Sequence, residues 1–188
     1  MVGWTLKSWT ATRISIEAML ELKSNDPVSI QDYDPAWPDA FSKLAARVTT
    51  ALGNLIVTVE HIGSTAVPGL AAKPIIDLDV ILALPADLAE AIRLLATIGY
   101  AHEGDLGIAG REALCSPPGE PRHHPYVLAA GANEQRRHLA FRDALRADRD
   151  LRDKYGALKR SLADQYKDDR NTYTESKSAF IISIVGIT

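Results

Sequence analysis

Two aspartates on one apolar segment constrain this chain more than any other feature. Residues 75–83 read IIDLDVILA, a run rich in aliphatic and β-branched residues that predicts a buried strand. Because side chains two positions apart share one face of a strand, Asp77 and Asp79 should project together while the alternate aliphatic residues pack into a core. Neighbouring carboxylates repel each other and resist burial, so this pattern calls for a nearby cation or proton.

A glycine–serine turn precedes this strand and adds phosphate-binding chemistry. Another apolar strand is expected over residues 55–62, and it runs into Gly63, Ser64 and Thr65. Backbone N–H groups and a hydroxyl in such a turn can bind phosphate, while paired carboxylates suit Mg²⁺ or Mn²⁺ together with phosphate oxygens. The alternative is an ordinary turn, with Asp77 bonded to nearby backbone and Asp79 at a polar strand edge.

The same residues carry a family resemblance. A glycine–serine turn, a short spacer and Asp-x-Asp on a strand resemble the nucleotidyltransferase superfamily, and residues 61–80 (HIGSTAVPGLAAKPIIDLDV) resemble its GrpB branch. The similarity extends from about residue 27 to the end and includes residues 28–41 (VSIQDYDPAWPDAF), Gly99-Tyr100, Arg111, His123-His124, residues 138–143 (HLAFRD), Tyr155, Leu158-Lys159, Tyr173 and Lys177.

The resemblance implies a nucleotidyltransferase fold and Mg²⁺-dependent transfer of a nucleoside monophosphate from an NTP to an acceptor hydroxyl. A small metabolite or a protein side chain is the expected acceptor. The rival is a catalytically inactive nucleotide-binding or accessory domain, like that fused to some dephospho-CoA kinases. Many superfamily enzymes carry a third acid on a further strand, yet residues 122–132 contain no Asp or Glu, and this favours the rival.

In this interpretation Asp77 and Asp79 are the catalytic and metal-binding residues. The nucleotide or phosphate contacts are expected at Gly63, Ser64, Thr65, Lys73, Arg111, His124, Arg142, Lys159 and Lys177. Lys73 is alternatively a solvated surface lysine. Most other charges of the C-terminal third alternate in sign at helical spacing, which is typical of a solvated, ion-paired face.

The remaining pattern predicts an α/β (α+β) domain, with a small mixed sheet flanked by helices and a helical C-terminal third. Helices are expected from about Pro38 to Leu52, from Pro85 to Gly99, over residues 133–169 with a break near Gly156, and over residues 173–184. A short strand over residues 28–33 and a hairpin of residues 109–116 and 122–129 complete the sheet.

Composition bounds the class of protein. A chain of 188 residues with 46% hydrophobic and 24% charged residues fits one globular domain, here residues 27–188 after an N-terminal extension over residues 1–26. A net charge of −3 gives no general attraction to nucleic acid. The single cysteine, Cys115, fits a reducing compartment, and no apolar run reaches membrane-spanning length, so a cytoplasmic protein is expected. The donor nucleotide, the acceptor and the oligomeric state stay open.

Overall fold

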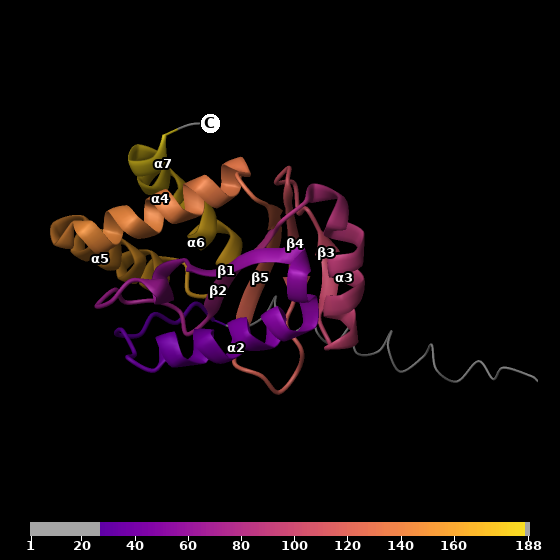
Figure 1. The fold of residues 1–188 in the computed structure, drawn as a ribbon. Coiled ribbons are helices and arrows are strands. Elements are labelled where there is room, and N and C mark those ends of the chain that lie inside the picture. Colours follow the sequence, from indigo (N-terminus) through magenta and orange to yellow (C-terminus); the bar gives the residue numbers. More distant parts are fainter. Residues whose placement is uncertain (1–26, 187–188) are drawn as a thin grey trace, which may run out of the picture.

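The computed structural model describes residues 27–186 as a five-stranded mixed sheet with helices on both faces (Figure 1). The strands are β1 (Ile56–Ile62), β2 (Ile76–Leu82), β3 (Ala101–Gly104), β4 (Arg111–Cys115) and β5 (His123–Ala129). Their order across the sheet is β1-β2-β5-β4-β3. The β2 and β5 strands are parallel, and the other neighbours are antiparallel. The predicted α/β class is therefore confirmed.

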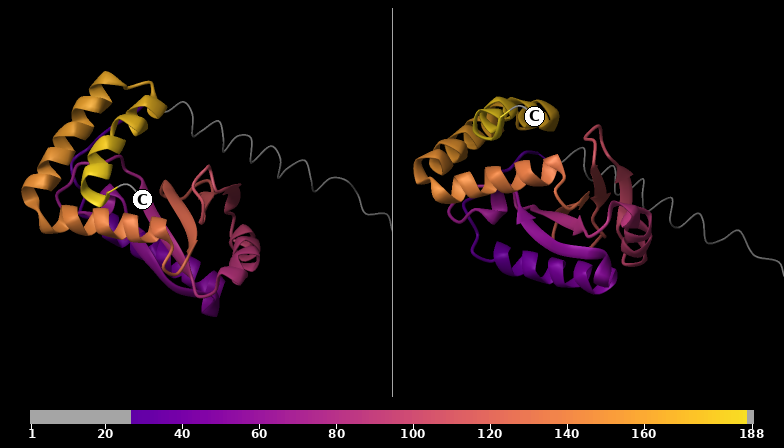
Figure 2. Two further views of the ribbon diagram at one scale, coloured as in Figure 1. Left: turned by 90° about the horizontal axis from the view of Figure 1, so that it is seen from above. Right: turned by 45° about the horizontal axis from the view of Figure 1, so that its top comes forward.

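The helices divide between the two faces. The first described helix is α2 (Trp37–Leu52), and α3 (Leu88–Thr97) follows β2. The C-terminal third forms α4 (Asn133–Ala147), α5 (Arg149–Gln165), α6 (Arg170–Ser176) and α7 (Ser178–Val185). Figure 2 shows these last four helices gathered on the side opposite α2. None of the helices within residues 27–186 is long and apolar enough to cross a membrane.

The main core lies between the sheet and α2. Leu44, Val48 and Leu52 recur along one face of α2 and pack in a buried cluster with Leu78 and Val80 of β2. Burial of these aliphatic side chains is the dominant stabilising contribution here. Because Leu78 and Val80 face α2, the alternate residues Asp77 and Asp79 must face the C-terminal helices. The predicted division of this strand into a core face and a polar face is thus confirmed.

A second apolar cluster fixes the C-terminal helices to the loop between β1 and β2. Val67 and Leu70 of that loop pack against Leu145 of α4 and Tyr155 of α5, and all four side chains are buried. The Tyr155 ring also stacks on Phe180 of α7 at a centroid distance of 5.0 Å. The helical wall is consequently built directly over the glycine–serine turn.

Several boundaries differ from the sequence prediction. The helical break falls at Asp148, whose carboxylate accepts from Leu151 N and caps α5, whereas Gly156 lies inside α5. The predicted final helix divides at Lys177 into α6 and α7. Residues 28–33 form only an isolated bridge between Gln31 and Ala72 rather than a strand. The helix predicted before Gly99 ends at Thr97, and β3 was not predicted. The expected N-terminal extension lies outside the described residues.

Candidate functional site

The turn after β1 brings its backbone against the first aspartate. Gly63 has a φ of +69°, a conformation that disfavours residues with a side chain. A Cβ atom added to Gly63 would lie 2.3 Å from Asp77 Oδ2. Ser64 then opens a short 3-10 turn that ends at Ala66. Glycine is therefore required at position 63 both for the turn and for the close approach of Asp77.

Asp77 contacts a histidine on the neighbouring strand β5. The register between β2 and β5 places His124 beside Asp77, and His124 Nδ1 lies 3.0 Å from Asp77 Oδ1. The Asp77 side chain remains 28% exposed. Burial opposes its ionisation, but the His124 hydrogen bond and the charges of Lys73 and Lys177 outweigh burial and lower the pKa of Asp77. Asp77 is consequently a carboxylate that a ligand can reach.

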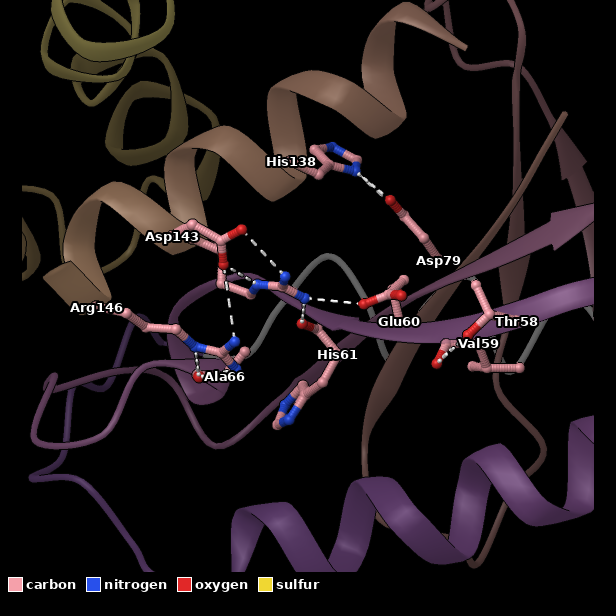
Figure 3. Close-up of polar contacts among 10 residues, drawn as sticks. Thr58, Val59, Glu60, His61, Ala66, Asp79, His138, Asp143 and Arg146 are labelled. Carbon is pink, nitrogen blue, oxygen red and sulfur yellow. Dashed lines mark hydrogen bonds and ion pairs between the residues drawn. The ribbon is translucent and has the colours of Figure 1, made fainter. Parts of the chain in front are cut away.

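Asp79 instead points toward His138 of α4, as Figure 3 shows. Its side chain is 0% exposed, and His138 Nδ1 of α4 lies 2.9 and 3.1 Å from its two carboxylate oxygens. His138 Nε2 lies 3.2 Å from Glu134 Oε1 on the same helix. Burial alone would lower the pKa of His138, but these two carboxylates raise it to about 9. Asp79 is therefore engaged by an imidazolium rather than open to a ligand.

The glycine–serine turn and Asp77 border one cavity of about 290 Å³, which we term the cationic cavity. Its lining brings together seven predicted site residues from the turn, the two central strands and the C-terminal helices: Ser64, Thr65, Lys73, Asp77, His124, Lys159 and Lys177. Tyr126, Arg170, Tyr173 and Thr174 add to the wall. The basic residues outnumber the single carboxylate, so the cavity suits an anion.

Lys159 connects the helical wall to the turn. Its side chain is 2% exposed, and its Nζ donates to Ser64 Oγ at 2.9 Å and to the Ala71 carbonyl oxygen. Burial, reinforced by the charge of Lys177, lowers the pKa of Lys159 to about 6. Burial and the charge of Lys73 likewise lower the pKa of Lys177 to about 8. A bound anion would relieve this mutual repulsion of the lysines.

Tyr173 separates two of these lysines. Its ring is buried, and the Nζ atoms of Lys177 and Lys73 lie 4.4 and 5.4 Å from its centroid. Contacts of this kind between an ammonium group and an aromatic ring are favourable and orient the side chain. Burial is also the first cause that lowers the pKa of Lys73. Lys73 is therefore packed into the wall rather than solvated on the surface.

Of the predicted phosphate contacts, Gly63, Arg111 and Arg142 do not line the cationic cavity, and the Thr65 hydroxyl lines it but bonds to the backbone. Arg142 Nη1 of α4 donates to Glu60 Oε2 at 3.0 Å and to the His61 carbonyl oxygen at 3.1 Å, and these bonds tie α4 to β1. The Thr65 hydroxyl donates to the Ile75 carbonyl oxygen at 3.3 Å. Arg111 lies beyond Asp77 against a separate cavity. In this structure Arg142 and the Thr65 hydroxyl thus hold the frame of the site.

The side chains of the site offer few ligands for a metal ion in this arrangement. Within residues 27–186, no group of three or more His, Cys, Asp or Glu side chains is placed to hold a metal ion. Asp77 offers one reachable carboxylate, and Mg²⁺ is often held by one or two carboxylates together with substrate phosphates. The residues therefore fit an ion shared between Asp77 and bound phosphate, whereas a ligand role for Asp79 requires His138 to release it.

His138 and Tyr173 belong to the family resemblance but were given no site role from the sequence, and Glu134, Arg170 and Thr174 were not predicted as site residues. His138 and Glu134 are four residues apart and therefore share a helix face, a signal that could have identified them as a pair. Arg170 and Thr174 carry no local signal, and Tyr173 carries only the family resemblance. Their place in the wall depends on how α5 and α6 pack over the turn, which a local pattern does not encode.

Comparisons with known proteins agree with this architecture. A family model described as GrpB protein matches residues 27–186. A UPF0157 protein of Halalkalibacterium halodurans is 37% identical over 88% of this chain and 85% of its own length. A crystal structure of the conserved protein GrpB from Enterococcus faecalis is 38% identical, with a TM-score of 0.75 over 83% of this chain and 94% of that one.

Two further similarities are partial. A dephospho-CoA kinase of Mycolicibacterium paratuberculosis is 30% identical over 80% of this chain, which matches 43% of the kinase. The Cid1 poly(U) polymerase bound to MgATP has a TM-score of 0.51 at 12% identity, over 84% of this chain and 47% of the polymerase. This second likeness shows the fold alone, and it confirms the nucleotidyltransferase-like architecture expected from the sequence.

Proposed function

The chain belongs to the GrpB family, and on that premise we propose that it is a nucleotidyltransferase that moves a nucleoside monophosphate from an NTP to an acceptor hydroxyl. The fold alone does not fix a reaction. The proposal therefore depends on the site, and one observation carries it. The Ser64 turn, the reachable carboxylate of Asp77, the buried Lys159 and two half-buried lysines all border the same cavity.

The cationic cavity suits the triphosphate of the donor. Ser64 Oγ and Lys159 Nζ lie 2.9 Å apart, so both can contact one phosphate group. Lys73 and Lys177 line the same cavity beside the Tyr173 ring. Together these groups would bind the β- and γ-phosphates, which leave as pyrophosphate, and stabilise the negative charge that builds on the leaving group.

Asp77 and His124 stand where the acceptor would react. The acceptor oxygen attacks the α-phosphorus, the bond from that phosphorus to the bridging oxygen breaks, and the hydroxyl proton must be taken up by a base. His124 Nδ1 donates to the Asp77 carboxylate, and in this proposal His124 Nε2 accepts the proton. His124 of β5 thus lies beside Asp77, and β5 is the strand that lacks the third acid.

Asp77, with phosphate oxygens, would hold Mg²⁺ or Mn²⁺, and such an ion would neutralise phosphate charge and lower the pKa of the acceptor hydroxyl. Asp79 joins only when His138 releases it, because His138 engages both carboxylate oxygens. In this proposal the ion pair of Asp79 and His138 holds α4 against β2 beside the site.

Calorimetric titration with ATP, GTP, CTP and UTP, each with Mg²⁺ and with EDTA, tests the proposal. We expect metal-dependent binding of at least one nucleotide, lost in Asp77→Asn and in Lys159→Met. Asp150→Asn is the matched control, because Asp150 is an exposed residue in the first turn of α5 that lines neither cavity. A nucleotide so identified is then supplied as donor in a screen for acceptors. No binding at millimolar nucleotide would refute the proposal.

A second candidate is a nucleotide-binding module without catalysis. The complete burial of Asp79 against His138 favours it, because only one of the two paired carboxylates is then reachable. In that case nucleotide binding would persist in EDTA and in Asp77→Asn, and would still be lost in Lys159→Met. The same titrations therefore separate the two functions.

A further inference from the structure

A second cavity lies on the other side of Asp77, and we term it the apolar cavity. Its volume is about 460 Å³, and it shares Asp77, Tyr126, Thr174 and Lys177 with the cationic cavity. Two small-molecule sites that meet at one carboxylate are the arrangement that a two-substrate reaction needs. A volume of this size holds a small molecule rather than a polymer.

One wall of the apolar cavity is aliphatic and aromatic. Phe141 of α4 and Ile108 of the loop before β4 face it together with three residues of α7, which are Ile181, Ile182 and Val185. No residue of α7 is fully buried, although most of its side chains are apolar, and Ile182 is 36% exposed. An apolar group bound against this wall would remove these side chains from water, which is favourable.

The facing wall contains a buried cation whose hydrogen bonding is incomplete. Arg111 is only 9% exposed, and its guanidinium carbon lies 4.5 Å from the centroid of the Tyr126 ring. Its Nε atom is buried and has no hydrogen-bond partner among the described residues. The guanidinium as a whole lines the cavity and is largely desolvated, so an anion beside it would stabilise the site. Arg137 of α4 also lines this cavity, with its Nε atom 4.0 Å from the carboxylate of Glu134, which lines it too.

We propose that the apolar cavity binds the acceptor, and that the acceptor is a small amphipathic anion that joins an apolar chain or ring to an anionic group and a hydroxyl. Its apolar part lies against α7, its anionic group faces Arg111, and its hydroxyl points to Asp77. The role of acceptor rests on the proposed function, whereas the binding site itself is inferred from the lining residues alone.

The binding site can be tested without nucleotide. The probe is 8-anilinonaphthalene-1-sulfonate, an apolar anion whose fluorescence rises on binding. We expect Ile182→Asp and Arg111→Met each to weaken its binding by about five-fold or more, a loss on the order of 1 kcal/mol. Ser183→Asp is the matched control, because it adds the same charge one residue away at an exposed position outside the lining. Equal binding in all four proteins would overturn the site.

A competition experiment tests the role of acceptor. With saturating Mg²⁺ and the nucleotide that binds best, the probe should remain bound, because donor and acceptor occupy separate cavities. Displacement by the nucleotide but not by inorganic tripolyphosphate would show that the cavity holds the nucleoside half of the donor, and would overturn the proposal. If the probe binds as expected but no nucleotide binds, the transfer function fails and the amphipathic-anion site remains.

Discussion

His138 Nδ1 lies 2.9 Å from Asp79 Oδ2 and joins α4 to the central strand β2. The partners are 59 residues apart in the sequence, and Asp79 is completely buried. Removal of His138 would leave a buried carboxylate without its counter-ion. The pair is therefore expected to stabilise the fold as well as to control access to Asp79.

The pH dependence of stability should reveal this pair. The folded pKa of His138, about 9, exceeds its reference value of 6.5, so its stabilisation is complete below pH 6.5 and is lost as pH rises through 9. A shift of this size corresponds to at most about 3 kcal/mol. Burial raises the pKa of Asp79, so the cost of burying that carboxylate offsets part of this value. Urea unfolding should show that His138→Ala costs up to about 3 kcal/mol at pH 6 and much less at pH 9.5. With Asp79→Asn as background, the loss should shrink. A cost independent of pH would contradict the ion pair.

Gly63→Ala should disrupt the turn and displace Asp77. The added Cβ meets Asp77 Oδ2 at 2.3 Å, in a backbone conformation with φ of +69°. Gly110→Ala is the matched control, because Gly110 has a φ of +79° with nothing within 4 Å of an added Cβ. We expect about 1 kcal/mol of destabilisation from the backbone alone in Gly110→Ala, and about 2–4 kcal/mol in Gly63→Ala. Equal losses in urea unfolding would show that the close contact is unimportant.

Local pattern predicted the strand face of Asp77 and Asp79 and the turn at Gly63 because each depends on neighbours in sequence. The two-residue period of β2 fixes which side chains share a face. It does not show that His138 takes both oxygens of Asp79, because that contact depends on the packing of α4. Likewise, Lys159 was predicted from the family resemblance, but its bond to Ser64 spans 95 residues.

Anion binding at Lys159 should be coupled to proton uptake. Its pKa of about 6 leaves it mostly neutral at pH 8, and a nearby phosphate would raise that pKa and favour the charged form. Titration with tripolyphosphate at pH 8, in buffers of different ionisation enthalpy, should show uptake of up to about one proton per phosphate chain bound. Lys159→Met should reduce the uptake, whereas Lys154→Met, at an exposed position of α5, should not. Uptake that is unchanged in Lys159→Met would refute this coupling.

Gly156→Ala provides a direct test of the corrected helix boundary. A glycine in the middle of a charged helical segment suggested a break, but Asp148 caps α5 and Gly156 lies within the helix against Leu70. An added Cβ would meet Leu70 Cδ1 at 3.6 Å, an ordinary van der Waals contact. Alanine is favoured over glycine inside a helix, so Gly156→Ala should raise the free energy of unfolding by about 0.5–1 kcal/mol.

A loss of stability is expected when the cap of α5 at Asp148 is removed. Asp148→Ala removes the side chain that accepts from Leu151 N and should cost about 1 kcal/mol. Urea unfolding of the two variants side by side decides between the boundaries. If Gly156→Ala destabilised the protein and Asp148→Ala had no effect, the break would lie where the glycine stands. Gly156 would then end one helix, and its contact with Leu70 of the loop between β1 and β2 would be a different one.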